Sequence, residues 1–193
     1  MDEITLIFEA MAGPLPDWHA LERHITWLNV AAGGEVFALG QAAPHVYVVT
    51  KGLLKLHHDD ENGRERIKSF AVEGGIVASI SALQPHGSAS FSASALEDTR
   101  LAKIPYTALE KMADTHLAWG RLLRAVLMGY AAQKEQREQG FLMQSAAQRY
   151  AVQMQSQPEL AARIIQKDFA AYLGVTPVGL SRIASRIAKI SDD

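Results

Sequence analysis

Turn residues divide the middle of the chain into short segments of similar length. The segments between the turns are rich in Val, Ile, Leu, Phe and Tyr, and a new turn arrives about every 8 to 12 residues. This pattern, with no helical periodicity between the turns, predicts an antiparallel β-roll or jelly roll and not a parallel sheet. The turns fall at Gly33, Gly34, Gly40, Gly52, Gly63, Gly74 and Gly75, and the expected strands at 36–39, 46–50, 53–58, 64–71, 91–96 and 101–104.

The turn before Arg64 carries the strongest hairpin signal. The sequence Asp60-Glu61-Asn62-Gly63 separates two of the expected strands. Asn and Gly both tolerate positive φ, so this pair predicts a tight hairpin turn.

The adjacent histidines His57 and His58 precede that turn. On a strand their side chains point to opposite faces, so the two cannot chelate one metal ion together. The other histidines show no ligand spacing. We therefore expect no metal site.

The residues before the first expected strand look helical or irregular. After Pro14 and Pro16 interrupt the run, apolar side chains resume at helical spacing and predict a helix that packs on the roll. We interpret Trp18 and Trp27 as core anchors, because a large ring usually marks buried area. The resumed stripe consists of Trp18, Leu21, Ile25 and Leu28.

A long helix is predicted after a short one that contains Leu109 and Met112. Asp114 or Thr115 can cap it, and we expect Gly140 to break it and to act as a hinge. Its stripe packs either on its own domain or against a second copy; a length of about 35 Å favours a two-fold dimer seam. The stripe comprises Trp119, Leu122, Leu123, Val126, Leu127 and Tyr130.

Two short helices joined by a tight turn are predicted between Gln166 and Ile187. Gly174 stands where the first helix must end in a left-handed conformation, and Thr176 followed by Pro177 forms an N-cap and a first-turn proline. This is the pattern of a DNA-binding helix-turn-helix, although an αα-corner inside a core has the same spacing.

Hydrogen-bond donors on the second of these helices favour the DNA-binding interpretation. Ser181, Arg182, Ser185 and Arg186 share its expected outer face and are not needed for packing. The whole chain has a net charge of −2, yet between Glu159 and Ile190 Asp168 is the only acid. It stands against five basic residues, Arg163, Lys167, Arg182, Arg186 and Lys189.

Composition excludes several classes of site. The 193 residues contain no cysteine, which rules out disulfides, thiolate zinc sites and Cys-ligated clusters. There is no catalytic motif, no basic start of a signal peptide and no apolar run of about 18 residues. We expect a cytoplasmic protein that is neither an enzyme nor a membrane protein.

The order of these parts resembles the Crp/Fnr family of bacterial transcription regulators over nearly the whole chain. The resemblance is carried by Gly34–Gly74 with its KGLLKL turn, by SALEDTRLAKI at Ser94–Ile104, and by RIIQKDFAAYLGVTPVGLSRI at Arg163–Ile183. It implies an α+β fold: a cyclic-nucleotide-binding-like β-roll at 1–114, a dimerisation helix and hinge at 115–140, and a winged-helix-like helix-turn-helix at 141–193. It also implies double-stranded DNA, a second copy of the chain and RNA polymerase as partners.

The effector pocket departs from that family. Members that bind cyclic nucleotides use a glutamate for the ribose and an arginine for the phosphate, and Ser79 and Ala89 stand at the corresponding positions. We expect a degenerate pocket lined by Gly75, Ser79, Ser88, Ala89 and Ser90, without tight binding of cyclic AMP or cyclic GMP and with no certain cofactor.

The DNA reader departs from the family as well. Val178 stands where many members have a glutamate, and the segment before Gln166 is too short for their β-hairpin wing. Arg182 matches the recognition arginine. The expected DNA-contacting residues are Lys167, Thr176, Pro177, Val178, Ser181, Arg182, Ser185 and Arg186.

Three functions remain open at this point. The leading one is a homodimeric regulator that binds a near-palindromic operator. The alternatives are a ligand-sensing or protein-interaction module that has lost DNA binding, and a regulator that still binds a cyclic nucleotide or another small effector.

Overall fold

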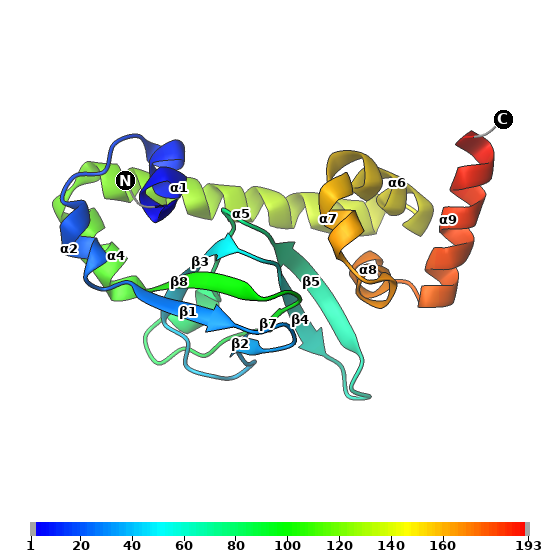
Figure 1. Cartoon of the computed structure of the whole chain (residues 1–193), viewed down its shortest axis with the longest axis horizontal. Helices are drawn as coiled ribbons and strands as arrows, with labels where there is room; N and C mark the ends of the chain where they lie inside the picture. The colour runs from blue at the N-terminus through cyan, green and yellow to red at the C-terminus, as the bar shows by residue number, and fades with distance from the viewer. Residues whose placement is uncertain (1–2, 192–193) are drawn as a thin grey trace. The chain divides into compact units, whose positions relative to one another are not determined.

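The computed structural model describes residues 3–191, with side chains described as far as residue 187. Lys189, one of the five basic residues, therefore has its side chain outside the described part. The chain forms two compact units, the first from residues up to 56 together with 70–131, the second from 57–69 together with the residues after 131. Figure 1 shows the elements of both units.

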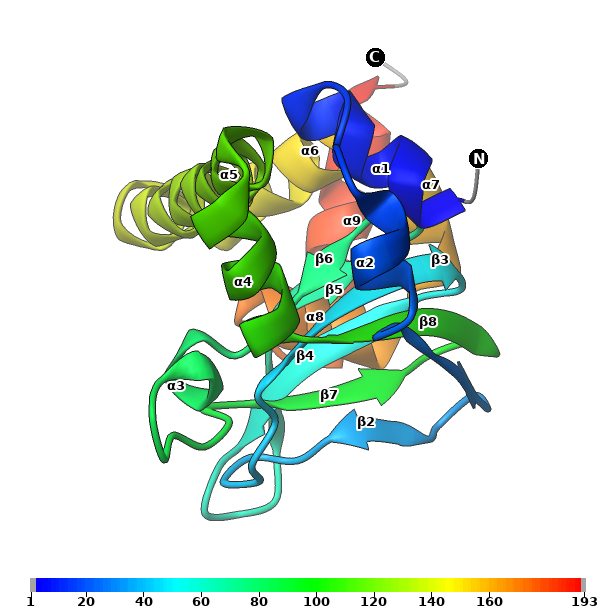
Figure 2. The ribbon, with the colours of Figure 1, turned by 90° about the vertical axis from the view of Figure 1, so that its left-hand side faces the viewer.

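The strands form a roll of two four-stranded sheets (Figure 2), which belongs to the first unit except for residues 57–69. In one sheet the order is β1 (Thr26–Val30), β8 (Thr99–Pro105), β3 (His45–Lys51) and β6 (Ile76–Val77). In the other it is β2 (Glu35–Phe37), β7 (Ser92–Ala95), β4 (Leu54–Asp59) and β5 (Glu65–Ala71). The registers of β1 with β8 and of β3 with β8 are antiparallel, so the predicted β-roll is confirmed.

All six expected strands are present, with their ends shifted by at most a few residues. Two strands, β1 and β6, were missed. β6 is only two residues long, which is too short for a periodic signal.

The expectation of a helix through Ile25 and Leu28 was wrong. The N-terminal part forms α1 (Glu3–Ala12) and the short helix α2 (Trp18–Glu22), and the chain is extended from Thr26. In β1 the partly buried Leu28 and Val30 alternate with exposed neighbours, which is the period of a strand. Of the four apolar residues at helical spacing, Trp18 and Leu21 therefore belong to α2, Ile25 to the link and Leu28 to β1.

Trp119 anchors the core between the roll and its helices. Its ring is fully buried, lies stacked on Trp18 with centroids 5.9 Å apart, and contacts Phe8 edge-on at 6.5 Å. The indole Nε1 donates a 2.9 Å hydrogen bond to the carbonyl of Pro16. Trp18 is thus the core anchor that was predicted. Trp27 is not, because it is 40% exposed and packs under the guanidinium of Arg100 at 4.2 Å.

The predicted dimer stripe is corrected at two positions. In the long helix α5 (Leu117–Met143), Trp119 is 0% and Leu122 1% exposed within the single chain. Both pack in the core with α4 (Tyr106–Thr115), so a partner has no access to them. Leu123 and Val126 are partly buried against the same core, Tyr130 is half-buried, and Leu127 is 49% exposed.

The second unit contains the end of α5 and four further helices. These are α6 (Ala146–Ser156), α7 (Pro158–Arg163), α8 (Gln166–Leu173) and α9 (Pro177–Ser191). α7 lies between α6 and α8 in the chain, and among residues 3–191 no strand follows β8. In the same range no helix is long and apolar enough to cross a membrane.

The predicted break at Gly140 was wrong, because α5 continues through it to Met143. One glycine costs a helix only about 1 kcal/mol. The break comes at Ser145, which begins α6 with a capping box: its hydroxyl accepts from the amide of Gln148, whose side chain accepts from the amide of Ser145.

Replacing Trp119 with alanine should destabilise the chain by about 3–5 kcal/mol, since it removes a fully buried ring and its hydrogen bond. The matched control is Trp27→Ala, which should cost less than about 2 kcal/mol because Trp27 is partly exposed. Urea unfolding monitored by circular dichroism measures both. Equal losses for the two variants would contradict this assignment of the core.

Candidate nucleic-acid interface and effector pocket

The turn between α8 and α9 has the predicted geometry. Gly174 ends α8 with φ 74°, and its amide bonds back to the carbonyls of Ala170 and Ala171. The Thr176 hydroxyl accepts a 3.1 Å hydrogen bond from the amide of Gly179, and Pro177 is the first residue of α9. The N-cap, the N1 proline and the left-handed glycine are confirmed.

Apolar side chains fix the two helices against α6. Phe169, Leu173 and Leu180 are at most 6% exposed, and the ring of Phe169 lies 5.8 Å from that of Tyr150 on α6. These contacts bury one face of α9 and determine which face is turned outward.

All residues that were predicted to contact DNA are exposed, and most of them share the outward face of α9. On α9, positions 178, 181, 182, 185 and 186 recur at one helical face and are all exposed, and Val178 reaches 62%. Lys167 in the first turn of α8 is also exposed, as are Thr176 and Pro177 at the turn. The αα-corner alternative predicted that this face would pack inside a core, and within the chain it does not.

Two arginines that the sequence analysis missed hold the end of α8. Arg137 on α5 donates Nη2 hydrogen bonds to the carbonyls of Tyr172, at 2.9 Å, and of Ile67 on β5, at 2.8 Å. Arg149 on α6 donates to the carbonyl of Leu173 at 2.9 Å. Burial lowers the pKa of Arg137, an effect that the nearby Tyr172 opposes.

An aromatic ring supports both arginines. Arg137 lies 4.8 Å and Arg149 4.5 Å from the centroid of Phe141. The helix-terminal carbonyls have no partner within α8, so cationic side chains there are stabilising. The available signal was two arginines on neighbouring predicted helices close to an aromatic residue, which is too common a pattern to be interpreted alone.

The segment expected to form the effector pocket lies in the first unit. Ser79 is 1% exposed, and its hydroxyl accepts a 2.9 Å hydrogen bond from the amide of Ser90. Ala89 is 2% exposed and packs in the apolar core beside Phe37 and Phe91. Ser88 and Ser90 are exposed, and Gly75 pairs with β3 through its carbonyl.

The charge of this segment does not favour a cyclic phosphate. No lysine or arginine occurs between Lys68 and Arg100. Ala89, in the place of the phosphate-binding arginine, turns its side chain into the core and has no donor there. The structure brings Ser79 and Ser90 together, but it places Ala89 on the apolar side.

The two adjacent histidines lie on opposite faces of β4, as expected, with His57 buried and His58 exposed. The expectation of no metal site compared histidines only with one another and did not consider carboxylates on neighbouring strands. Among residues 3–187 the structure brings together one other group with ligand atoms at chelating distances, formed by His57, Asp59 and Glu65.

Comparison with known protein families identifies the class of domain to which the β-roll belongs. Residues 27–116 match the family model of the cyclic nucleotide-binding domain, so the chain contains a domain of that family. A match to a lysophospholipase of Chaetomium globosum, 30% identical over 92 residues, covers 48% of this chain and only 6% of that enzyme.

Relatives that match most of the chain identify it further as a relative of the Crp/Fnr-type regulators. The transcriptional regulatory protein btr of Bordetella pertussis is 28% identical over 175 residues, 84% of this chain and 71% of its own length. The anaerobic regulatory protein of Haemophilus influenzae is 26% identical over 167 residues, 80% of this chain and 64% of its own length. The resemblance found in the sequence is confirmed.

Solved structures show the same fold. FixK2 from Bradyrhizobium japonicum superposes with a TM-score of 0.77 at 22% identity and covers 86% of both chains. A CooA variant from Carboxydothermus hydrogenoformans gives 0.75 at 14% identity, covering 95% of this chain and 84% of that one.

Gly174→Ala should destabilise the second unit by about 1–3 kcal/mol, because a non-glycine residue is strained at positive φ. Its Cβ would also lie 2.9 Å from Cε1 of Phe141. The matched control is Gly140→Ala inside α5, where the nearest contact is the flexible Gln144 side chain at 3.4 Å.

Thermal unfolding should show stabilisation of about 0.5–1 kcal/mol for that control. A stabilising Gly174→Ala, or a destabilising Gly140→Ala, would be inconsistent with this turn and this helix.

Proposed function

We propose that the chain is a homodimeric DNA-binding transcription regulator. The observation that carries the proposal is the outward face of α9, where donors and one apolar side chain are exposed; Lys167 in the first turn of α8 is exposed as well. A helix with this pattern, preceded by a tight turn, fits the major groove as the recognition helix of a helix-turn-helix.

Each exposed residue has a role that follows from its chemistry. Arg182 is placed to donate two hydrogen bonds to a guanine, with Ser181 and Ser185 as further donors. Val178 suits a thymine methyl group better than a cytosine. Arg186, Lys167 and Thr176 are assigned to phosphates, which set position and salt dependence and carry no direct sequence information.

The dimer seam is proposed on the exposed side of α5. Leu117, Leu127 and Met128 are 71%, 49% and 66% exposed; Leu117 and Met128 share one helical face, and Leu127 lies at its border. Exposed large apolar residues in a row mark an interaction surface. This seam replaces the predicted stripe at Trp119 and Leu122.

Two such copies would place two α9 helices on one duplex, with half-sites about one helical turn or about 34 Å apart. RNA polymerase is the partner proposed for a regulator bound in this way.

The effector pocket is proposed to have no tight affinity for cyclic AMP or cyclic GMP. A cyclic phosphate bound there would lose its charge-assisted bidentate contact, because no cation lies between Lys68 and Arg100. The hydroxyl of Ser79 is already engaged by the amide of Ser90.

The second candidate is a ligand-sensing or interaction module that no longer binds DNA. Two observations favour it: the valine at position 178, and the lack of any strand after β8 among residues 3–191, so that no wing hairpin there supplies phosphate contacts.

Selection of bound duplexes from a random library with the purified protein tests the proposed function directly. We expect a two-fold symmetric consensus with half-sites about one helical turn apart, and affinity that falls steeply with salt. The second candidate predicts no enrichment at any salt concentration.

Arg182→Ala should lose preference at one base pair of the selected site, at a cost of about 1–3 kcal/mol, while binding random duplexes nearly as before. Arg186→Ala should weaken selected and random duplexes alike and flatten the salt dependence. Fluorescence anisotropy at several salt concentrations separates the two roles. Equal losses on both kinds of duplex for both variants would refute the assignment.

Isothermal titration with cyclic AMP and cyclic GMP should show no binding at micromolar concentrations. A micromolar affinity of the unaltered chain would overturn the proposal of a degenerate pocket.

A further inference from the structure

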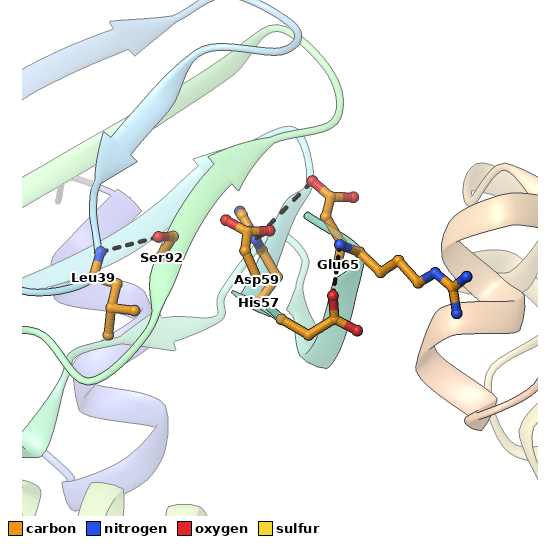
Figure 3. Close-up of polar contacts among 7 residues, drawn as sticks. Leu39, His57, Asp59, Glu65 and Ser92 are labelled. Atoms are coloured by element: carbon orange, nitrogen blue, oxygen red, sulfur yellow. Dashed lines mark hydrogen bonds and ion pairs between the residues drawn. The ribbon is translucent and has the colours of Figure 1, made fainter. Parts of the chain in front are cut away.

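The hairpin between β4 and β5 brings three possible metal ligands together. His57 and Asp59 are two residues apart on β4 and share one face, and Glu65 begins the neighbouring strand β5. Figure 3 shows the three side chains converging. One ligand atom from each lies within 4.8 Å of the others.

The hairpin loop fixes this arrangement. The carboxylate of Asp60 accepts hydrogen bonds from the amides of Asn62 and Arg64, both at 3.0 Å. The Arg64 amide in particular lowers the pKa of Asp60. Gly63 has φ 69°, and its amide donates to the carbonyl of Asp60 at 2.8 Å. The predicted hairpin is therefore confirmed, with positive φ at Gly63 alone of the Asn-Gly pair.

The distances at the cluster are also close to those between the ligands of a metal ion. Nδ1 of His57 lies within ion-pair distance of both carboxylates, 3.5 Å from Oδ1 of Asp59 and 4.0 Å from Oε1 of Glu65. Zinc bonds of about 2.0–2.2 Å in a tetrahedral site put ligand atoms about 3.3–3.5 Å apart. Asp59 is at that separation already, and Glu65 is slightly further away.

The three side chains differ in their burial. His57 is 8% exposed, whereas Asp59 and Glu65 are 55% and 24% exposed. The cluster therefore combines one buried imidazole with two carboxylates on the solvent side.

We propose that His57, Asp59 and Glu65 form a binding site for a divalent transition-metal ion of the zinc class. One imidazole nitrogen with two carboxylates suits Zn²⁺ and its neighbours, whereas Mg²⁺ and Ca²⁺ prefer oxygen ligands alone. Three protein ligands leave at least one position for water. The local charge is favourable, because four carboxylates stand against two arginines between residues 59 and 66.

The same hairpin is tied to the C-terminal helices. Arg137 bonds at once to the carbonyl of Ile67 on β5 and to that of Tyr172 at the end of α8. An ion bound by Glu65 therefore rigidifies β5 two residues from Ile67, whose carbonyl Arg137 contacts. Any effect on DNA binding rests on the proposed function, but metal binding itself does not.

Titration of the tag-free full chain with Zn²⁺ by isothermal calorimetry tests the site, and the absence of cysteine removes thiolate background. We expect one ion per chain with micromolar affinity, and no comparable binding of Mg²⁺. Asp59→Asn and Glu65→Gln, which are nearly isosteric, should each weaken binding at least about tenfold.

His58→Ala and Glu61→Gln are the matched controls, since both residues belong to the same hairpin but not to the cluster. They should bind Zn²⁺ within about twofold of the unaltered chain. Amide hydrogen exchange of residues 57–66 should slow on adding Zn²⁺ to the unaltered chain and not to Glu65→Gln. Unchanged affinity of both ligand variants, or binding weaker than millimolar in the unaltered chain, would overturn the site and leave the DNA-binding proposal standing.

Discussion

The C-terminal unit depends on how the last carbonyls of α8 are satisfied. The last carbonyl groups of any helix have no partner within the helix, and a helix end that is buried without other partners is costly. Arg137 and Arg149 donate to the carbonyls of Tyr172 and Leu173, and both guanidinium groups pack against Phe141. This network fixes where α8 stops, hence where α9 begins and which of its faces is exposed.

The same network connects the hairpin between β4 and β5 to the end of α8. Arg137 also bonds to β5, so the hairpin with His57, Asp59 and Glu65 is connected by two hydrogen bonds to the helix that precedes the proposed reader. The segment expected to form the effector pocket, by contrast, has no lysine or arginine between Lys68 and Arg100, and the hydroxyls of Ser79 and Ser90 lie 3.3 Å apart. The hairpin, with one imidazole and two carboxylates, offers ligand chemistry that this segment does not.

Patterns in the sequence correctly predicted the features that depend on interactions between residues close together in the chain. Strand positions followed from turn spacing, and the α8–α9 turn followed from Gly174, Thr176 and Pro177, because φ preference and capping act within a few residues. The exposed reader face was also predictable, since the apolar residues of α9 define its buried side. Helical spacing failed at Ile25 and Leu28, where a run of apolar residues crossed from α2 into β1.

The sequence by itself determined the β-roll, the order of the elements and the residues that face outward on α9, because these depend on local periodicity and turn chemistry. Only the tertiary structure decided that Trp119 and Leu122 belong to the core of one chain, and that Glu65 lies beside His57 and Asp59. It alone also decided that Arg137 bridges β5 and α8. Contacts of this kind join residues far apart in sequence, and their side chains carry no periodic signal that names the partner.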